Sequence, residues 1–179
     1  MRLSKSITAG AALVALVALT GCGGGGDKGS SGPSKDDLGL PAAGDMASIE
    51  KFINQHAKCT NLRPVDEEGK GLLEKEAKDP AWAIKERAVC DDGSRQTITL
   101  LSISDMAKFQ ATNRAGKKYE ALVGKNFAVV PTDDGTVKAL MNAKMLTLTC
   151  DPDGYQIPSG YKQHKGLVEG CILTDYNRS

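Results

Sequence analysis

The chain has 179 residues, a length typical of one domain. Its 23 Lys and Arg residues nearly balance its 22 Asp and Glu residues, which argues against a nucleic-acid binder that works through a basic surface. Aromatic residues make up 4% of the chain, so a large stacking platform for sugars or bases is not expected.

Residues 1–21 have the three parts of an export signal. Arg2 and Lys5 give a positive start, and an apolar run of 13 residues follows from Ile7 to Leu19. That run is shorter than the roughly 20 residues that a helix needs to span a bilayer. The sequence therefore predicts a secretory signal peptide over residues 1–21.

The signal ends in Leu19-Thr20-Gly21-Cys22, which resembles the lipobox of bacterial prolipoproteins. The resemblance implies that the Cys22 thiol receives a diacylglycerol group and that residues 1–21 are then removed. The expected partner is the membrane, reached through this lipid, and the expected location is the extracytoplasmic face of the cell membrane. An ordinary cleaved signal with a chance cysteine and an uncleaved anchor are the alternatives.

Residues 22–44 are low in complexity and begin, after Cys22, with four consecutive glycines. Such a segment buries too little apolar surface to offset its chain entropy, so it is expected to be a flexible tether. A phosphate-binding loop is disfavoured, because no strand precedes the glycines and no Lys-Ser/Thr pair ends them.

Residues 45–179 are expected to form one disulfide-stapled domain. Asp45 can cap a helix over 46–58, whose apolar residues recur at helical spacing, and a short helix is expected near 72–77. From Trp82 the pattern changes to period two and predicts two strands, 82–90 and 96–103. The Asp-Asp-Gly-Ser turn at 91–94 joins them into an antiparallel hairpin.

The second half of the domain alternates between helices and strands. A helix capped by Ser104 or Asp105 is expected to end near Gly116, and another is expected after a cap at Thr132 or Asp133. Strands are expected at 125–130 and 145–150, a loop at 151–170, and an edge strand at 171–175. The predicted fold class is α+β, with a mixed sheet of four or five strands and helices on one face.

Four cysteines remain once Cys22 is assigned to the lipid: Cys59, Cys90, Cys150 and Cys171. They allow three pairings, of which 59–90 and 150–171 are favoured. An oxidising compartment permits structural disulfides. A zinc site or a redox dithiol is disfavoured, because the chain has no Cys-x-x-Cys motif, and no metal or cofactor is expected.

Residues 82–150 loosely resemble small uncharacterised secreted lipoproteins of actinobacteria. The shared features are Cys90 at the end of a strand, the strand 98–103 followed by a helix that contains Phe109, and residues 123–130 (VGKNFAVV). The resemblance implies no catalytic residues.

No catalytic signature occurs in the domain, so a non-enzymatic binding or envelope-associated module is expected, with an envelope protein or a small ligand as partner. Tyr155, Tyr161 and Tyr176 lie in or beside the long loop and are candidates for a small binding surface. The alternative is an extracytoplasmic hydrolase that uses His56 or His164 with a remote acid.

Overall fold

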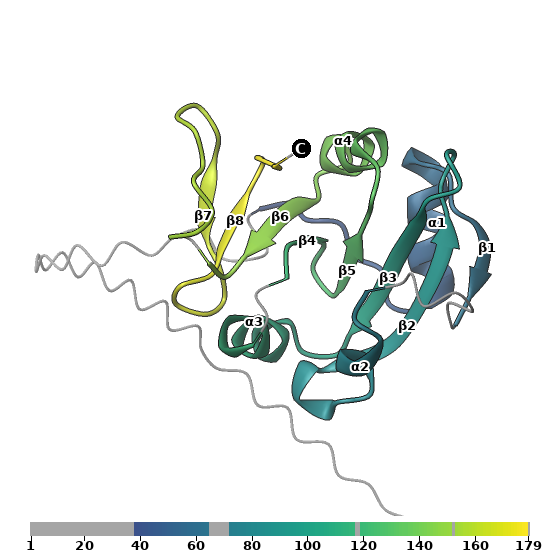
Figure 1. Ribbon diagram of the computed structural model, residues 1–179, viewed down its shortest axis with the longest axis horizontal. Coiled ribbons are helices and arrows are strands. Elements are labelled where there is room, and N and C mark those ends of the chain that lie inside the picture. The colour runs from purple at the N-terminus through teal and green to yellow at the C-terminus, as the bar shows by residue number, and fades with distance from the viewer. Residues whose placement is uncertain (1–37, 65–71, 117–118, 152, 179) are drawn as a thin grey trace, which may run out of the picture. The chain divides into compact units, whose positions relative to one another are not determined.

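A twisted sheet of eight strands forms the framework of the domain in the computed structural model, which describes residues 38–64, 72–116, 119–151 and 153–178 (Figure 1). The spatial order of the strands is β1-β2-β3-β5-β4-β6-β8-β7, and every neighbouring pair is antiparallel. The strands are β1 Thr60–Arg63, β2 Ile84–Asp91, β3 Thr97–Ile103, β4 Ala121–Val123, β5 Phe127–Val130, β6 Leu146–Thr149, β7 Gln163–Lys165 and β8 Ile172–Thr174.

The α+β class is confirmed, but the expected mixed sheet of four or five strands is wrong. The short strands β1, β4 and β7 account for the larger number of strands. β4 also accounts for the absence of parallel pairs, because it pairs with β5 on one side and with β6 on the other. The helical connections from β3 to β4 and from β5 to β6 each join strands of the same direction, but each skips one strand position. Because β5 lies between β3 and β4, and β4 lies between β5 and β6, strands of the same direction are not neighbours and every pairing is antiparallel. The segment 171–175, expected at an edge, forms β8, which lies between β6 and β7.

The helices begin at the residues that the capping signals predict. Asp45 accepts a hydrogen bond from the Ser48 N–H group at 2.8 Å, and Asp105 and Asp133 cap the two later helices in the same way. The helices are α1 Met46–His56, α2 Glu74–Ala77, α3 Met106–Ala115 and α4 Asp134–Asn142, with a 3₁₀ turn, η1, at Pro80–Trp82.

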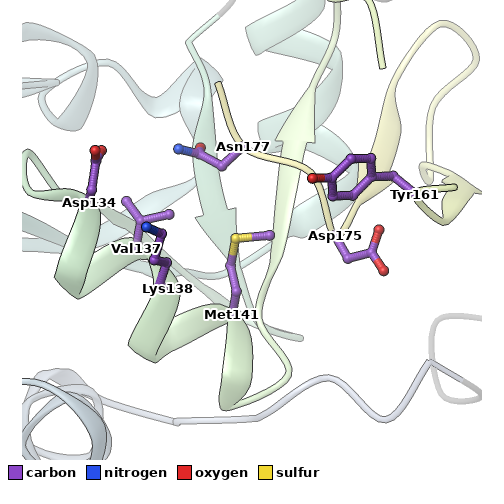
Figure 2. A pocket seen from close by; sticks show the side chains of 7 residues that line it. All are labelled: Asp134, Val137, Lys138, Met141, Tyr161, Asp175 and Asn177. Carbon is purple, nitrogen blue, oxygen red and sulfur yellow. The ribbon is translucent and has the colours of Figure 1, made fainter. Parts of the chain in front are cut away.

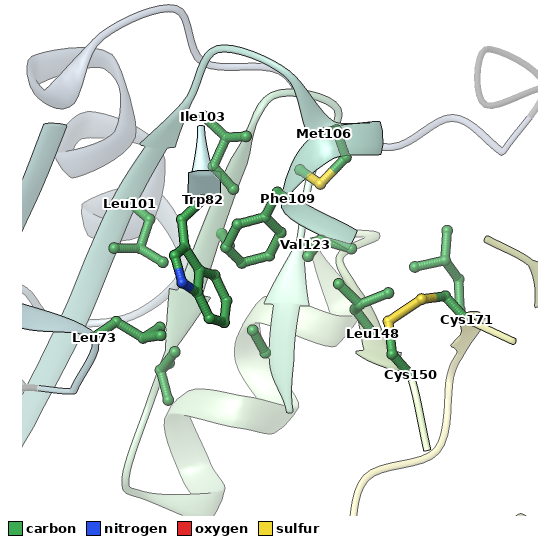
Figure 3. Packing of buried hydrophobic residues seen from close by; sticks show 14 of the residues in the cluster. Leu73, Trp82, Leu101, Ile103, Met106, Phe109, Val123, Leu148, Cys150 and Cys171 are labelled. Atoms are coloured by element: carbon green, nitrogen blue, oxygen red, sulfur yellow. A yellow bond between two sulfur atoms is a disulfide. The ribbon is translucent and has the colours of Figure 1, made fainter. Parts of the chain in front are cut away.

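Helices cover both faces of the sheet, so the expectation of helices on one face is also wrong. Successive residues of β3 enter different hydrophobic clusters, with Leu100 on one face and Leu101 on the other. The Leu100 cluster includes residues of α1 and α4, whereas the Leu101 cluster includes Trp82 of η1 and Phe109 of α3 (Figure 3). Because both faces of β3 are buried, its sequence lacks the polar alternation of a half-exposed strand.

The domain starts before Asp45 and includes part of the expected tether. Leu40 and Ala43 are buried, and the Lys125 N–H group donates to the Pro41 carbonyl oxygen at 2.7 Å. The Ala43 N–H group donates to Asn126 Oδ1 at 3.0 Å. Residues 38–44 therefore pack against the turn between β4 and β5. The predicted signal peptide, Cys22 and the rest of the tether lie outside the described residues.

Two disulfides join segments that are distant in the chain, and they are the pairs favoured from the sequence. Cys59–Cys90 ties the segment after α1 to β2, and Cys150–Cys171 ties the end of β6 to the residue before β8 (Figure 3). Both sulfurs of the second disulfide lie 3.6 Å from the Gln110 carbonyl oxygen of α3. Within the described ranges, no helix has both the length and the apolar character needed to cross a membrane.

Candidate functional site

The two histidines considered for catalysis lie on different elements and are not brought together. His56 is exposed in the last turn of α1, where its ring lies 4.9 Å from the Phe52 ring. His164 lies on β7, the last strand of the sheet, whereas α1 packs on β2 and β3 near the other edge. In the part of the chain that the structure describes, no hydrogen bond joins either imidazole to a carboxylate or hydroxyl group. The geometry therefore offers no His–acid pair.

A polar groove lies between α4 and the C-terminal segment 175–178 and is here called the α4 groove. It consists of two cavities, of about 200 Å³ and about 230 Å³, which share Asp134, Val137 and Asn177. The first is also lined by Lys138, Met141, Tyr161 and Asp175 (Figure 2). The second is also lined by Glu120, Ala121, Leu122, Val130, Pro131, Thr132, Thr147 and Arg178.

Threonines on β6 and β8 make the sheet polar beneath the α4 groove. The alternating sequence Leu-Thr-Leu-Thr of β6 directs Leu148 into the cluster on the far face and Thr147 toward the α4 side. Thr147 is 1% exposed and lies directly opposite Thr174 of β8. Thr147 lines the second cavity, and its buried hydroxyl has no hydrogen-bond partner among the described residues. Buried polar groups usually have a partner, so this unpaired hydroxyl distinguishes the wall of the second cavity.

Three of the chain's four tyrosines gather at one end of the α4 groove. The Tyr161 ring is 47% exposed and packs 4.8 Å from the Tyr176 ring, which in turn lies 5.7 Å from the buried Tyr155 ring. Figure 2 shows the Tyr161 phenol directed toward α4 from the opposite side of the groove. The structure thus brings together the three tyrosines that the sequence suggested as a surface, but Tyr155 is part of the core behind it.

The buried Tyr155 holds the C-terminal segment through its phenol. The Tyr155 hydroxyl donates to the Tyr176 carbonyl oxygen at 3.1 Å and accepts from the Arg178 N–H group at 3.2 Å. Burial raises the pKa of Tyr155 above its ordinary value, because the interior penalises the charged phenolate. The neutral phenol is therefore the form that fixes this wall of the groove.

The Arg178 side chain holds the end of the C-terminal segment 175–178 in place. Arg178 Nη2 lies 2.6 Å from Glu120 Oε1, and Nη1 donates to the Gly154 carbonyl oxygen at 3.0 Å. The guanidinium also lies over the Tyr155 ring, 4.5 Å from its centroid. The hydrogen bond to Glu120 raises the pKa of Arg178, so its charge is retained at any physiological pH. The second wall of the α4 groove is thus a fixed segment rather than a free tail.

The α4 groove carries charges of both signs. Glu120 is paired with Arg178, and Asp134 and Lys138 extend from successive turns of α4. One oxygen of Asp175 accepts a hydrogen bond from the Lys162 N–H group at 2.7 Å. No group of three or more His, Cys, Asp or Glu side chains in the described ranges is placed to hold a metal ion. The arrangement suits hydrogen bonding to a ligand without strong net charge.

Sequence reasoning missed most residues of this groove, including Thr147, Asp175 and Asn177. The sequence feature that pointed toward the groove was the group of tyrosines in and beside the long loop. Three of them lie within residues 155–176 of a chain that is poor in aromatic residues. Comparisons of the chain with protein-family models, with curated proteins and with solved structures find no match.

Proposed function

We propose that this protein is a lipid-anchored, extracytoplasmic binding module that holds a ligand in the α4 groove without transforming it. The observation that carries the binding role is Thr147, which lines a polar cavity and whose buried hydroxyl has no partner among the described residues. Leaving such a group unpaired costs about 1–3 kcal/mol, which a ligand that pairs with it recovers on binding.

The sequence Leu19-Thr20-Gly21-Cys22 supports the anchor, through its resemblance to the prolipoprotein lipobox. Two acyl chains on Cys22 hold a small protein stably on a membrane, because each buried methylene contributes about 0.8 kcal/mol. The two disulfides fit this location, since an oxidising compartment preserves them.

Binding is proposed rather than hydrolysis because neither His56 nor His164 lines the α4 groove. The groove's carboxylates are held apart in separate roles, with Glu120 paired to Arg178 and Asp175 bonded to the Lys162 N–H group. Nothing in this arrangement activates a hydroxyl or a water by a neighbouring base.

The anchor is tested by growing cells with labelled palmitate. Label in the wild-type protein and none in Cys22→Ser supports the lipid anchor. Equal labelling of both proteins, or a protein recovered from the cytosol with residues 1–21 still attached, contradicts it.

The binding role is tested by filling the groove. Asn177 lines both cavities, so Asn177→Trp is expected to abolish the thermal stabilisation that envelope small-molecule fractions give to the wild type. Gln163→Trp is the matched control, because Gln163 is exposed on β7 outside the groove. Stabilisation that survives in Asn177→Trp contradicts a ligand site in the groove.

A further inference from the structure

We infer that the ligand of the α4 groove is a neutral saccharide. The inference rests on the proposed function and adds the chemical class of the ligand. It is carried by the charge balance of the groove, its exposed tyrosine and its mixture of hydrogen-bond donors and acceptors.

The charges of the groove disfavour a phosphate or a carboxylate ligand. Asp134 and Asp175 line the cavities and would repel an anion. The N-terminus of α4, which would otherwise attract one, is already capped by Asp133, which accepts a hydrogen bond from the Thr136 N–H group at 2.9 Å.

A strongly cationic ligand is also disfavoured in the first cavity. Lys138 lines that cavity, so an ammonium group there would meet a positive charge. In the second cavity, Arg178 and Glu120 form an ion pair, so neither the guanidinium nor the carboxylate is available to a ligand as an unpaired ion. A neutral ligand that forms many hydrogen bonds fits this balance best.

Tyr161 offers a surface for the apolar face of a sugar ring. Its ring lines the first cavity, is 47% exposed, and is supported from behind by the Tyr176 ring at 4.8 Å. A pyranose presents C–H groups on its faces and hydroxyl groups around its rim. An aromatic ring next to polar side chains matches this division. One supported ring is enough for a single sugar unit, so the scarcity of aromatic residues in the chain is no obstacle.

The polar side chains of the groove supply what sugar hydroxyls need. Each hydroxyl is both a donor and an acceptor, and Asn177 and Thr147 also have both capacities. Asp134 accepts and Lys138 donates at the mouth of the first cavity. Thr147 is the most buried of these residues, so a sugar hydroxyl or acetamido group gives its unpaired oxygen a partner only if it enters the second cavity fully and the Thr147 side chain turns toward it.

The experiment titrates the purified full chain, in dodecylphosphocholine, with chitotriose and with maltotriose, and screens it on an array of bacterial envelope glycans. A detergent without a sugar headgroup is required. Inorganic phosphate and putrescine serve as the anionic and cationic probes. We expect calorimetric binding of at least one saccharide and of neither charged probe.

Two variants locate the site. Tyr161→Ala removes the exposed ring and should lower saccharide affinity at least tenfold, whereas Leu167→Ala, 43% exposed beyond the other end of β7, should leave it unchanged. Thr147→Val should lower the affinity about two- to tenfold, the range for one hydrogen bond.

Each remaining outcome overturns the inference in a distinguishable way. Binding of phosphate or putrescine that Thr147→Val weakens, without saccharide binding, rejects the ligand class and keeps the α4 groove as a binding site. Saccharide binding that neither Tyr161→Ala nor Thr147→Val changes puts the sugar elsewhere. Binding of no probe and no arrayed glycan, together with wild-type behaviour of Asn177→Trp toward envelope fractions, rejects both the saccharide and the proposed function.

Discussion

Thr147 of β6 and Thr174 of β8 lie directly opposite each other, yet only the Thr174 hydroxyl has a hydrogen-bond partner among the described residues. It accepts from the Tyr176 N–H group at 3.1 Å and so fixes the start of the C-terminal segment. Both side chains are fully buried, with exposures of 1% and 0%. Two equivalent residues in register thus differ: the Thr174 hydroxyl stabilises the groove wall, whereas the Thr147 hydroxyl has no partner among the described residues.

This difference predicts opposite results for two isosteric substitutions. Thr174→Val removes an acceptor and leaves the Tyr176 N–H group unpaired, so it should lower the free energy of unfolding by about 1–3 kcal/mol. Thr147→Val removes a buried hydroxyl that has no partner among the described residues, so it should leave the free energy of unfolding unchanged or raise it by up to about 1–3 kcal/mol. Urea denaturation of the two variants measures both values. A larger loss in Thr147→Val than in Thr174→Val would show that the Thr147 hydroxyl is already satisfied within the protein.

The turn between β4 and β5 predicts a severe effect of a single methyl group. A Cβ added at Gly124 would lie 2.6 Å from the Pro41 carbonyl oxygen and would also overlap the Phe127 ring. Gly124→Ala should therefore destabilise the domain by about 1–3 kcal/mol or more, because backbone and a buried ring must move. Gly44→Ala is the control, since a Cβ at Gly44 meets nothing within 4 Å. Equal stability of the two variants, measured by thermal unfolding, would contradict the packing of residues 38–44 on this turn.

Removing either disulfide should destabilise the domain. The bonded cysteines are 31 residues apart in Cys59–Cys90 and 21 residues apart in Cys150–Cys171, so the chain-entropy model gives each about 3–4 kcal/mol. We expect the double variants C59A/C90A and C150A/C171A to unfold at lower urea concentration than the wild type. Alkylation of the unreduced, denatured protein followed by intact mass analysis is the control. Modification of two or more of these four cysteines would disprove the pairing.

The buried phenol of Tyr155 predicts a loss of stability at alkaline pH. The pKa of Tyr155 is raised in the folded state by burial, so its stabilising effect is complete below the unfolded pKa of about 10 and disappears as pH rises through the folded value. Tyr155→Phe loses the hydrogen bond to the Tyr176 carbonyl oxygen and should be about 1 kcal/mol less stable at pH 7.

The stability difference between wild type and Tyr155→Phe should shrink above about pH 10, because phenylalanine cannot ionise. Urea titrations at pH 7, 9 and 10.5 give this difference directly. A difference that is the same at all three values would rule out ionisation of Tyr155 as a cause of alkaline unfolding.

Helix starts and the first hairpin could be predicted from the sequence, because their signals are local. Asp45, Asp105 and Asp133 each stand just before an apolar helical pattern, and each caps a helix. The turn at 91–94 separates two runs long enough to show strand character, and β2 and β3 pair across it.

The strands that the sequence did not reveal are too short to show a pattern. β4 has three residues, all buried, and β7 has three polar residues at the edge of the sheet. The second residue of β1 is Asn61, whose positive φ of 57° breaks the regular strand geometry. Their pairing depends on contacts with distant segments, and β4 alone decides that the sheet is antiparallel throughout.

The candidate groove was even less visible in the sequence. Thr147 belongs to an ordinary alternating strand, and nothing local distinguishes its hydroxyl from that of Thr174. The distinction arises only in the folded chain, where the Tyr176 N–H group donates to the Thr174 hydroxyl and no described group pairs with the Thr147 hydroxyl. The pairing of Glu120 with Arg178 joins residues 58 positions apart in the chain, which no local pattern encodes.

The contact between Pro41 and Lys125 has a mechanical consequence under the proposed lipid anchor, which would hold the chain from its N-terminal side. A pulling force transmitted along the chain from residue 38 would reach the hydrogen bond from the Lys125 N–H group to the Pro41 carbonyl oxygen before it reached any strand. If that hydrogen bond broke and the Leu40 side chain left the core, the force would act next on α1 and then on Cys59. The disulfide from Cys59 to Cys90 would prevent the chain between these two cysteines from being extended. Under force, residues 38–44 would thus detach first, and the Cys59–Cys90 disulfide would limit how much of the chain unfolds after them.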